Sequence, residues 1–418
     1  MKTHFSLQGV VRHQLENGLT VLTREDHTAP IVSSMVWYRV GSRVETEGLT
    51  GVSHLLEHMM FKGSKAYSKG EIDFITTRLG GSNNAFTSRD YTAYYFSFAS
   101  DRWTPALEIE ADRMNNLVLD PEEFELERQV VLEELRMDLD SPWGSLRHAV
   151  EANSFRLHPY RHPIIGLEVD LVGLRLDDLK AHYRRHYVPN NATLVVVGDF
   201  ATPEVMRKVE ALFAPLPRGA VPDSHVPSEP KREKEVRVSV SKPTHVARML
   251  WAYPAPSVRE PEHYSIDLID KIASEGKLGR LYRRLVEQEQ LASLMSTEFD
   301  ETLDPYLFFI RAELQPGIDP DRVERVIREE LDRLQNDLVA ENEFERARNQ
   351  SLAQVLADFE TTLDQAVQIG LLETLDRYEY WNDYSDRLQS LTRQDVRDAA
   401  EKYFKSSQGT LGVLVDGD

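Results

Sequence analysis

Two histidines and a glutamate occur within five consecutive residues, and side chains of these types can hold and use a metal ion. The segment reads His54-Leu55-Leu56-Glu57-His58. On a helix, His54 and His58 are four residues apart and lie on one face, close enough to share one ion. Glu57 projects to the same side, where a carboxylate can take a proton from water. The spacing therefore predicts a metal site with its own general base.

The helix that carries this segment is predicted to be buried, because residues 51–61 are apolar at nearly every position around the three polar ones. A carboxylate and two imidazoles buried together cost free energy unless something compensates, and a divalent cation is the simplest compensation. The chain has no cysteine, so histidine and carboxylate must supply the ligands, as they do in many zinc sites. A single buried histidine is usually structural, but the three residues together favour metal binding.

A catalytic zinc needs three protein ligands and one open position for water. The acid-rich stretch 125–136 offers the third ligand on another helix, and three apolar residues mark its buried face: Val130, Val131 and Leu135. Glu127 and Glu134 are seven residues apart and point along one stripe of that helix. Glu133 is rotated by about 100° and is expected to face solvent. By spacing alone, Glu125, Glu127 and Glu133 still compete with Glu134.

The composition argues against two classes of partner. The net charge of −20 would repel nucleic acid and anionic membranes. No stretch approaches the roughly 18 to 20 consecutive apolar residues that a membrane-spanning helix needs. The first residues lack the apolar core of a secretory signal, so we expect a cytoplasmic protein.

The elements that must position these residues are arranged in an internal repeat. Residues 183–200 and 403–416 share one pattern, in which a helix ends in an aromatic residue and a short polar turn leads to a buried strand. A length of 418 residues also suits two domains. We predict a zinc-binding domain at 1–214, a proline-rich linker at 215–234 and a homologous domain without zinc ligands at 235–418.

Strands and helices are mixed in both halves, which predicts the α+β class with an α/β sandwich in each domain. The first half has four clear strand patterns: residues 19–23, 31–40, 82–87 and 91–99. The second half repeats them in the same order: residues 236–240, 247–253, 294–299 and 306–314. Helices are expected at 51–61 and 69–79 and between the later strands.

The segment from His54 to His58 has the H-x-x-E-H pattern of inverzincins. Further motifs are distributed along the whole chain: residues 16–21, 41–45, 84–88, 127–135, 140–144, 158–163 and 191–199. On these motifs the chain resembles the pitrilysin/insulinase family of zinc metallopeptidases, and within it the bacterial and mitochondrial-processing-peptidase-like branch.

The resemblance implies a fold and a set of roles. Two homologous domains would form half of a clam-shell chamber in which a peptide is hydrolysed. The third zinc ligand would be Glu134, which follows His58 by 76 residues (134 − 58). Glu127 would orient a ligating histidine, and Glu57 would be the general base. Strand 82–87 resembles the family's substrate-binding edge strand, where Asn84 and Ala85 would pair with an extended peptide.

The sequence departs from the family at two positions. Active members carry an arginine and a tyrosine, seven residues apart, that hold substrate from the far side of the chamber. Val286 and Ser293 stand at these positions here. The resemblance therefore implies a heterodimer with a homologous subunit that supplies the Arg/Tyr pair. The alternative is a subunit that keeps zinc and binds peptides, or has a structural role, without turnover.

Overall fold

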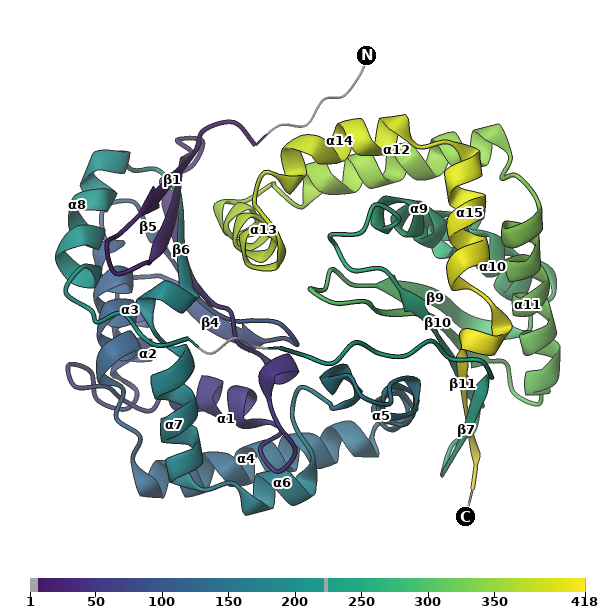
Figure 1. The fold of residues 1–418 in the computed structure, drawn as a ribbon, viewed down its shortest axis with the longest axis horizontal. Coiled ribbons are helices and arrows are strands. Elements are labelled where there is room, and N and C mark those ends of the chain that lie inside the picture. Colours follow the sequence, from purple (N-terminus) through teal and green to yellow (C-terminus); the bar gives the residue numbers. More distant parts are fainter. Residues whose placement is uncertain (1–6, 222–224, 418) are drawn as a thin grey trace.

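Each half of the chain is built around one twisted sheet, and the two halves face each other (Figure 1). The computed structural model describes residues 7–221 and 225–417. Pro222, Asp223 and Ser224 of the predicted linker lie outside the described residues.

The first sheet has six strands in the order β1-β2-β6-β3-β5-β4. Their bounds are β1 Val10–Gln14, β2 Thr20–Glu25, β3 Ile31–Tyr38, β4 Ser82–Thr87, β5 Thr92–Ala99 and β6 Ala192–Gly198. β2 and β6 are parallel, and all other neighbours are antiparallel. The strand β4, which the sequence predicted at these same residues, lies at the edge of the sheet.

The second sheet repeats this arrangement with five strands in the order β7-β11-β8-β10-β9. Their bounds are β7 Val236–Lys242, β8 Arg248–Ala255, β9 Ala292–Phe299, β10 Tyr306–Leu314 and β11 Thr410–Asp416. β7 and β11 are again the parallel pair. Apart from β1, which has no counterpart among the described residues, every strand of the first sheet has an equivalent in the second. The predicted α+β fold with two homologous domains is therefore confirmed.

Helices cover these sheets. In the first half they are α1 Val52–Met59, α2 Glu71–Arg78, α3 Thr104–Asn116, α4 Pro121–Asp140, α5 Pro142–Ser154, α6 Glu168–Gly173, α7 Leu176–His186 and α8 Thr202–Phe213. In the second they are α9 His263–Ser274, α10 Arg280–Tyr282, α11 Pro320–Asn336, α12 Glu341–Ala357, α13 Thr362–Leu375, α14 Tyr380–Ser390 and α15 Arg393–Tyr403. A π-helical turn, Arg283–Gln288, extends α10. No helix in the described ranges is both long and apolar enough to cross a membrane.

One helix from each half packs on the sheet of the other half. α13 lies against β3 and β6, and α5 lies against β7, β8 and β11. The approach is close, since a Cβ added at Gly370 of α13 would lie 2.0 Å from the Trp37 Nε1 of β3. A Cβ at Gly412 of β11 would lie 2.4 Å from the Val150 Cγ2 of α5. The sequence predictions did not include this exchange.

The exchange explains why residues 194–197 of β6 are all apolar. Val195 and Val197 belong to a core that also contains Ile369 of α13, while Leu194 and Val196 belong to the core on the other face. All seven residues of β6 are buried. A strand that is covered on both faces needs apolar residues at every position rather than at alternate positions.

Candidate metal centre

The helix α1 is anchored at its first turn and buried along most of its surface. Both oxygens of the Glu45 carboxylate accept backbone hydrogen bonds, from the N–H of Gly51 and that of Ser53, each at 2.8 Å. These bonds satisfy donors that the start of a helix leaves free. Leu55 and Leu56 are fully buried, so the helix is fixed in rotation and presents its polar residues toward α4.

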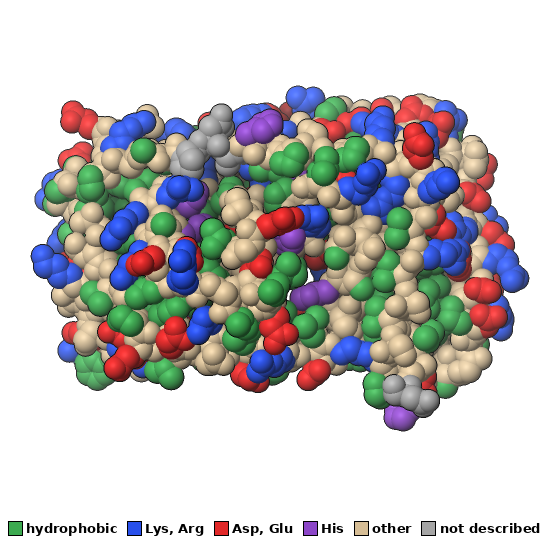
Figure 2. All heavy atoms as spheres, turned by 60° about the horizontal axis from the view of Figure 1, so that its bottom comes forward, with side chains coloured by type: hydrophobic (Ala, Val, Ile, Leu, Met, Phe, Trp, Pro, Cys, Tyr) green, Lys and Arg blue, Asp and Glu red, His purple; other side chains and the backbone are tan. Residues whose placement is uncertain are grey.

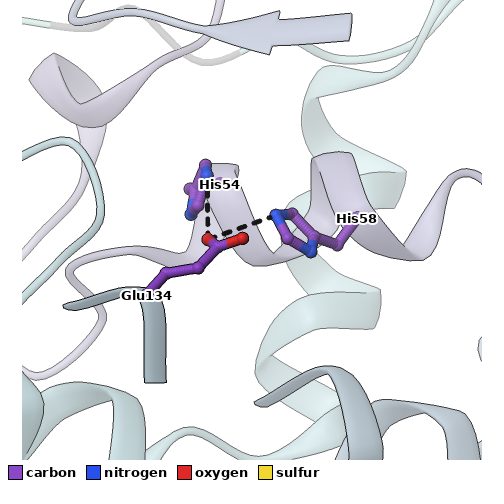
Figure 3. Close-up of side chains that lie close together, drawn as sticks. All are labelled: His54, His58 and Glu134. Carbon is purple, nitrogen blue, oxygen red and sulfur yellow. Dashed lines mark ion pairs between the residues drawn. The ribbon is translucent and has the colours of Figure 1, made fainter. Parts of the chain in front are cut away.

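The structure brings the side chains of His54, His58 and Glu134 together (Figure 3). The Glu134 Oε2 lies 4.0 Å from the His54 Nε2 and 3.7 Å from the His58 Nε2. Ligand atoms on a tetrahedral zinc with bonds of about 2 Å lie about 3.3 Å apart, so small side-chain movements suffice to close this cluster. Among the described residues, this is the one group of three histidine or acidic side chains placed to hold an ion.

The donor set fits zinc. Two imidazoles and one carboxylate are a ligand combination that catalytic zinc sites use. Burial, with the neighbouring His58, lowers the pKa of His54 to about 4. The ring is therefore neutral near pH 7, which is the form that binds a metal. Its Nδ1 is buried and has no hydrogen-bond partner within the described part of the chain.

Glu127 contacts the second histidine of the cluster. The His58 Nδ1 donates to the Glu127 Oε2 at 3.2 Å, which leaves the His58 Nε2 on the side of Glu134. The Lys62 Nζ contacts the other Glu127 oxygen at 2.6 Å. An outer carboxylate of this kind selects the tautomer of a metal-binding histidine. The contact of Lys62 with Glu127 was not predicted. The position of this lysine on the turn directly after α1 could have suggested from the sequence that it lies near the site.

Glu57 is held by a hydroxyl group that the sequence analysis did not single out. The Thr87 Oγ1, at the end of β4, donates to the Glu57 Oε2 at 2.6 Å. Burial raises the pKa of Glu57 above its ordinary value, and the hydrogen bond from Thr87 acts in the opposite direction. One carboxylate oxygen is thus fixed, while the residue lines a cavity.

This cavity has a volume of about 580 Å³ and is lined by residues of the first half alone. His54, Glu57 and Glu134 line one part of it, and Ala85 of β4 lines another. Asn84, predicted to bind substrate with Ala85, is exposed and is not among the described lining residues. The volume is within the range of small-ligand and active-site pockets.

The lining of the cavity also contains charged side chains that the sequence analysis missed. The Glu151 Oε1 accepts from the Arg89 Nη2 at 2.9 Å and from the Arg147 Nε at 2.8 Å. The Tyr306 hydroxyl donates to the same oxygen at 2.6 Å, and the Arg147 Nη2 lies 2.6 Å from the Glu298 Oε1. Since Glu298 and Tyr306 belong to the second half, this network ties the cavity wall to the other sheet.

Val286 and Ser293 belong to the second half of the chain, whereas the cluster of His54, His58 and Glu134 belongs to the first. Val286 packs against the core of the second half, and the Ser293 Oγ donates to the Glu313 backbone oxygen at 3.3 Å. Neither is among the described residues that line the cavity.

The second half contains a degenerate counterpart of the segment that carries His54 and His58. Residues 267–276 (Asp-Leu-Ile-Asp-Lys-Ile-Ala-Ser-Glu-Gly) stand in register with residues 54–63 (His-Leu-Leu-Glu-His-Met-Met-Phe-Lys-Gly). Asp270 takes the place of Glu57 and accepts a hydrogen bond from Thr297 of β9, as Glu57 does from Thr87. Aspartate and lysine replace the two histidines. Within residues 225–417 no group of three side chains is placed to hold an ion.

Comparisons with known proteins agree with this fold. The family model described as insulinase (peptidase family M16) matches residues 20–168, and the model described as the peptidase M16 inactive domain matches residues 173–351. The zinc protease PqqE of Helicobacter pylori is 30% identical over 406 residues, which are 96% of this chain and 91% of that protein. The mitochondrial-processing peptidase subunit beta of Blastocladiella emersonii is 30% identical over 236 residues, 56% of this chain and 50% of that protein.

A solved structure of a protease from Helicobacter pylori has a TM-score of 0.93 at 29% identity and covers 97% of this chain and 99% of that one. The arrangement of the two sheets, the full-length similarity to a zinc protease and the matches to both family models lead to one conclusion. This chain belongs to the insulinase family of peptidases, family M16.

Proposed function

We propose that this chain is a zinc-dependent endopeptidase subunit that hydrolyses extended peptides. The observation that carries the proposal is the convergence of His54, His58 and Glu134 beside a cavity that His54, Glu134 and Glu57 line. The full-length relative from Helicobacter pylori, which is named a zinc protease, supports it.

The proposed ligands are the Nε2 atoms of His54 and His58 and a carboxylate oxygen of Glu134. When bound, zinc supplies a Lewis acid that makes water acidic enough to lose a proton near neutral pH and polarises a peptide carbonyl. Glu57 accepts that proton and passes it to the amine that leaves. Thr87 holds the Glu57 Oε2, so the other oxygen is the one that moves the proton.

The edge strand β4 is the proposed place for the peptide. The Ala85 N–H donates to the Asn84 side-chain Oδ1 at 2.9 Å. A peptide that adds as a further strand would take over such a donor with its own carbonyl groups. Binding through the backbone selects extended chains and depends little on side-chain sequence.

A homologous partner is proposed for full activity. Val286 has no polar group, and the short side chain of Ser293 is already bonded to Glu313. Neither can replace an arginine or a tyrosine that reaches across a chamber to the substrate. The relative from Blastocladiella emersonii is named as the beta subunit of a peptidase, which supports a pairing with a second chain that carries the Arg/Tyr pair.

The test is zinc analysis and hydrolysis of a quenched-fluorescent peptide library by the purified chain, alone and with a homologous Arg/Tyr-bearing chain. Glu57→Gln should keep one zinc and lose cleavage, whereas Glu134→Ala should lose the metal. Glu133→Gln is the matched control, because Glu133 lies next to Glu134 but its side chain is 65% exposed and pairs with Arg136. A fully zinc-loaded Glu134→Ala protein would overturn the assignment.

The departures at Val286 and Ser293 favour one second candidate function, a subunit that binds peptides with its zinc in place but does not cleave them. Stoichiometric zinc and measurable peptide binding, with no cleavage even when the partner is present, would identify that function.

A further inference from the structure

A larger cavity, unrelated to the metal cluster, lies in the second half of the chain. It has a volume of about 780 Å³, is open to solvent on one side, and is bordered by the end of α11, the start of α12 and residues 278–288. None of its lining residues lines the cavity at His54 and Glu57.

The lining of this cavity is basic in a protein that is strongly acidic. Five arginines contribute to it: Arg280, Arg283, Arg284, Arg333 and Arg346. Three acidic residues also line it: Glu330, Asp337 and Glu343. The formal charge of the lining is therefore +2 (5 − 3) in a chain with a net charge of −20. By contrast, acidic and basic side chains are interspersed over the molecular face in Figure 2.

Three of the arginines are neutralised by the acids around them. The guanidinium of Arg280 makes two hydrogen bonds of 2.7 Å with the carboxylate of Glu343. Glu330 accepts from Arg284 at 3.0 Å and from Arg333 at 2.8 Å. Arg284 also pairs with Glu289 and Glu329 beside the cavity. The two other arginines make no ion pair with a described residue, and neither does Asp337, the third lining acid.

Arg346 and Arg283 are the two arginines left over. The Arg346 Nη1 and Nη2 are both buried and have no hydrogen-bond partner among the described residues. Arg283 is exposed and makes no ion pair with any described residue. A guanidinium does not lose its proton in a protein, so an enclosed and unpaired one is relieved by an anion.

The other lining groups indicate which anion fits. Gln288 and Asn342 add amide groups that can donate hydrogen bonds, and the described lining residues include no aromatic ring on which a nucleobase could stack. Arginine matches phosphate oxygens with two parallel hydrogen bonds. We propose that this cavity is a binding site for a compact phosphate-type anion of the pyrophosphate class, held by Arg283 and by Arg346 after a change of its rotamer.

The test is titration of the intact zinc-loaded chain with sodium pyrophosphate at constant ionic strength. Binding is measured by calorimetry and by the change in the melting temperature of the protein. A ligand that binds the folded state alone raises the melting temperature in a saturable way. We expect the Arg283→Gln and Arg346→Gln variants to bind at least tenfold more weakly. Arg322→Gln is the matched control, since it removes the same charge from an exposed position of α11 outside the cavity.

Two further arms distinguish the outcomes. Arg346→Lys keeps the charge and loses the planar fork, so it should fold and bind more weakly than the natural chain. Citrate at the same ionic strength tests a tricarboxylate. Any of three results would overturn the proposal. These are an equal loss of binding in Arg283→Gln and Arg322→Gln, the absence of saturable binding, and citrate binding that is as tight as pyrophosphate binding.

Discussion

Glu127 acts on the proposed zinc site through His58 rather than through the metal. Its carboxylate holds the His58 Nδ1 at 3.2 Å and is itself held by Lys62. Glu127→Gln should therefore keep the fold but weaken zinc binding about 10- to 100-fold, the usual effect of losing an outer partner of a ligand. Competition with a zinc-binding dye measures the change. Glu125→Gln, on an exposed carboxylate that pairs with Arg128, should leave zinc affinity unaltered; an equal loss there would argue for a general charge effect.

Asp304 stabilises the contact between the two halves through a pH-dependent carboxylate. Burial alone would raise its pKa, but hydrogen bonds from His158 and Arg43 outweigh burial and lower the pKa to about 2. Because the pKa is lower in the folded protein than in the unfolded chain, the stabilisation is present above about pH 4 and is lost as the pH falls toward 2.

Asp304→Asn should therefore lower the free energy of unfolding by about 1 to 2 kcal/mol near neutral pH, an estimate reduced for water screening of a side chain that is 29% exposed. About half of this difference should remain at pH 3. Urea titrations at both pH values measure it. The control is Asp332→Asn on the exposed side of α11, and a difference between wild type and Asp304→Asn that grows as the pH falls would contradict the prediction.

The residues of the site differ in how far the sequence could predict them. His54, Glu57 and His58 are neighbours on one helix, so their spacing in the sequence determines how their side chains lie relative to one another. Glu134 needed the family resemblance, because several acids of its helix are equivalent by spacing. Thr87 could not be placed, since its bond to Glu57 depends on how β4 lies beside α1.

At the scale of elements, local patterns predicted most strands and helices but not their tertiary partners. β1 was not predicted and pairs with β2 at the edge of the first sheet. Val130 was expected on the buried face of α4 but is 44% exposed. The buried stripe passes through Glu127, Val131 and Leu135, at intervals of four residues, so Val130 lies one position outside it.

The packing of α13 on the first sheet can be tested at Gly370. A Cβ there would lie 2.0 Å from the Nε1 of Trp37 and 2.3 Å from its Cε2. Because the indole ring is buried, it cannot move aside to make room. Although alanine favours a helix over glycine, Gly370→Ala should lower the free energy of unfolding by about 1 to 3 kcal/mol through overpacking. Gly173→Ala is the control, because nothing lies within 4 Å of its added Cβ; equal urea midpoints for the two variants would rule out the close packing.

At the scale of the whole molecule, the exchange of α5 and α13 makes each half depend on the other. Residues 1–214 alone would expose the face of β3 and β6 that α13 covers, and residues 235–418 alone would lose α5 from β7, β8 and β11. Separately produced halves should therefore aggregate or stay unfolded, and co-expressed halves should elute as one 1:1 complex in size-exclusion chromatography. Two soluble, cooperatively unfolding monomers would contradict this expectation.

No local pattern in the sequence predicts such an exchange. The partners of α13, β3 and β6, lie more than 150 residues before it in the chain, and an apolar helix face does not specify which sheet it will cover. The internal repeat indicated two equivalent sheets, but either sheet offers the same kind of apolar surface to either helix.

The exchange also has a mechanical consequence. If the two halves only touched each other, they could rotate apart about the segment that connects them. Here such a swing would have to peel α13 off β3 and draw α5 away from β11, breaking the close contacts at Trp37 and Val150. The chain should therefore move as one rigid shell, and the gap that admits a peptide must open at the seam between this chain and its proposed partner.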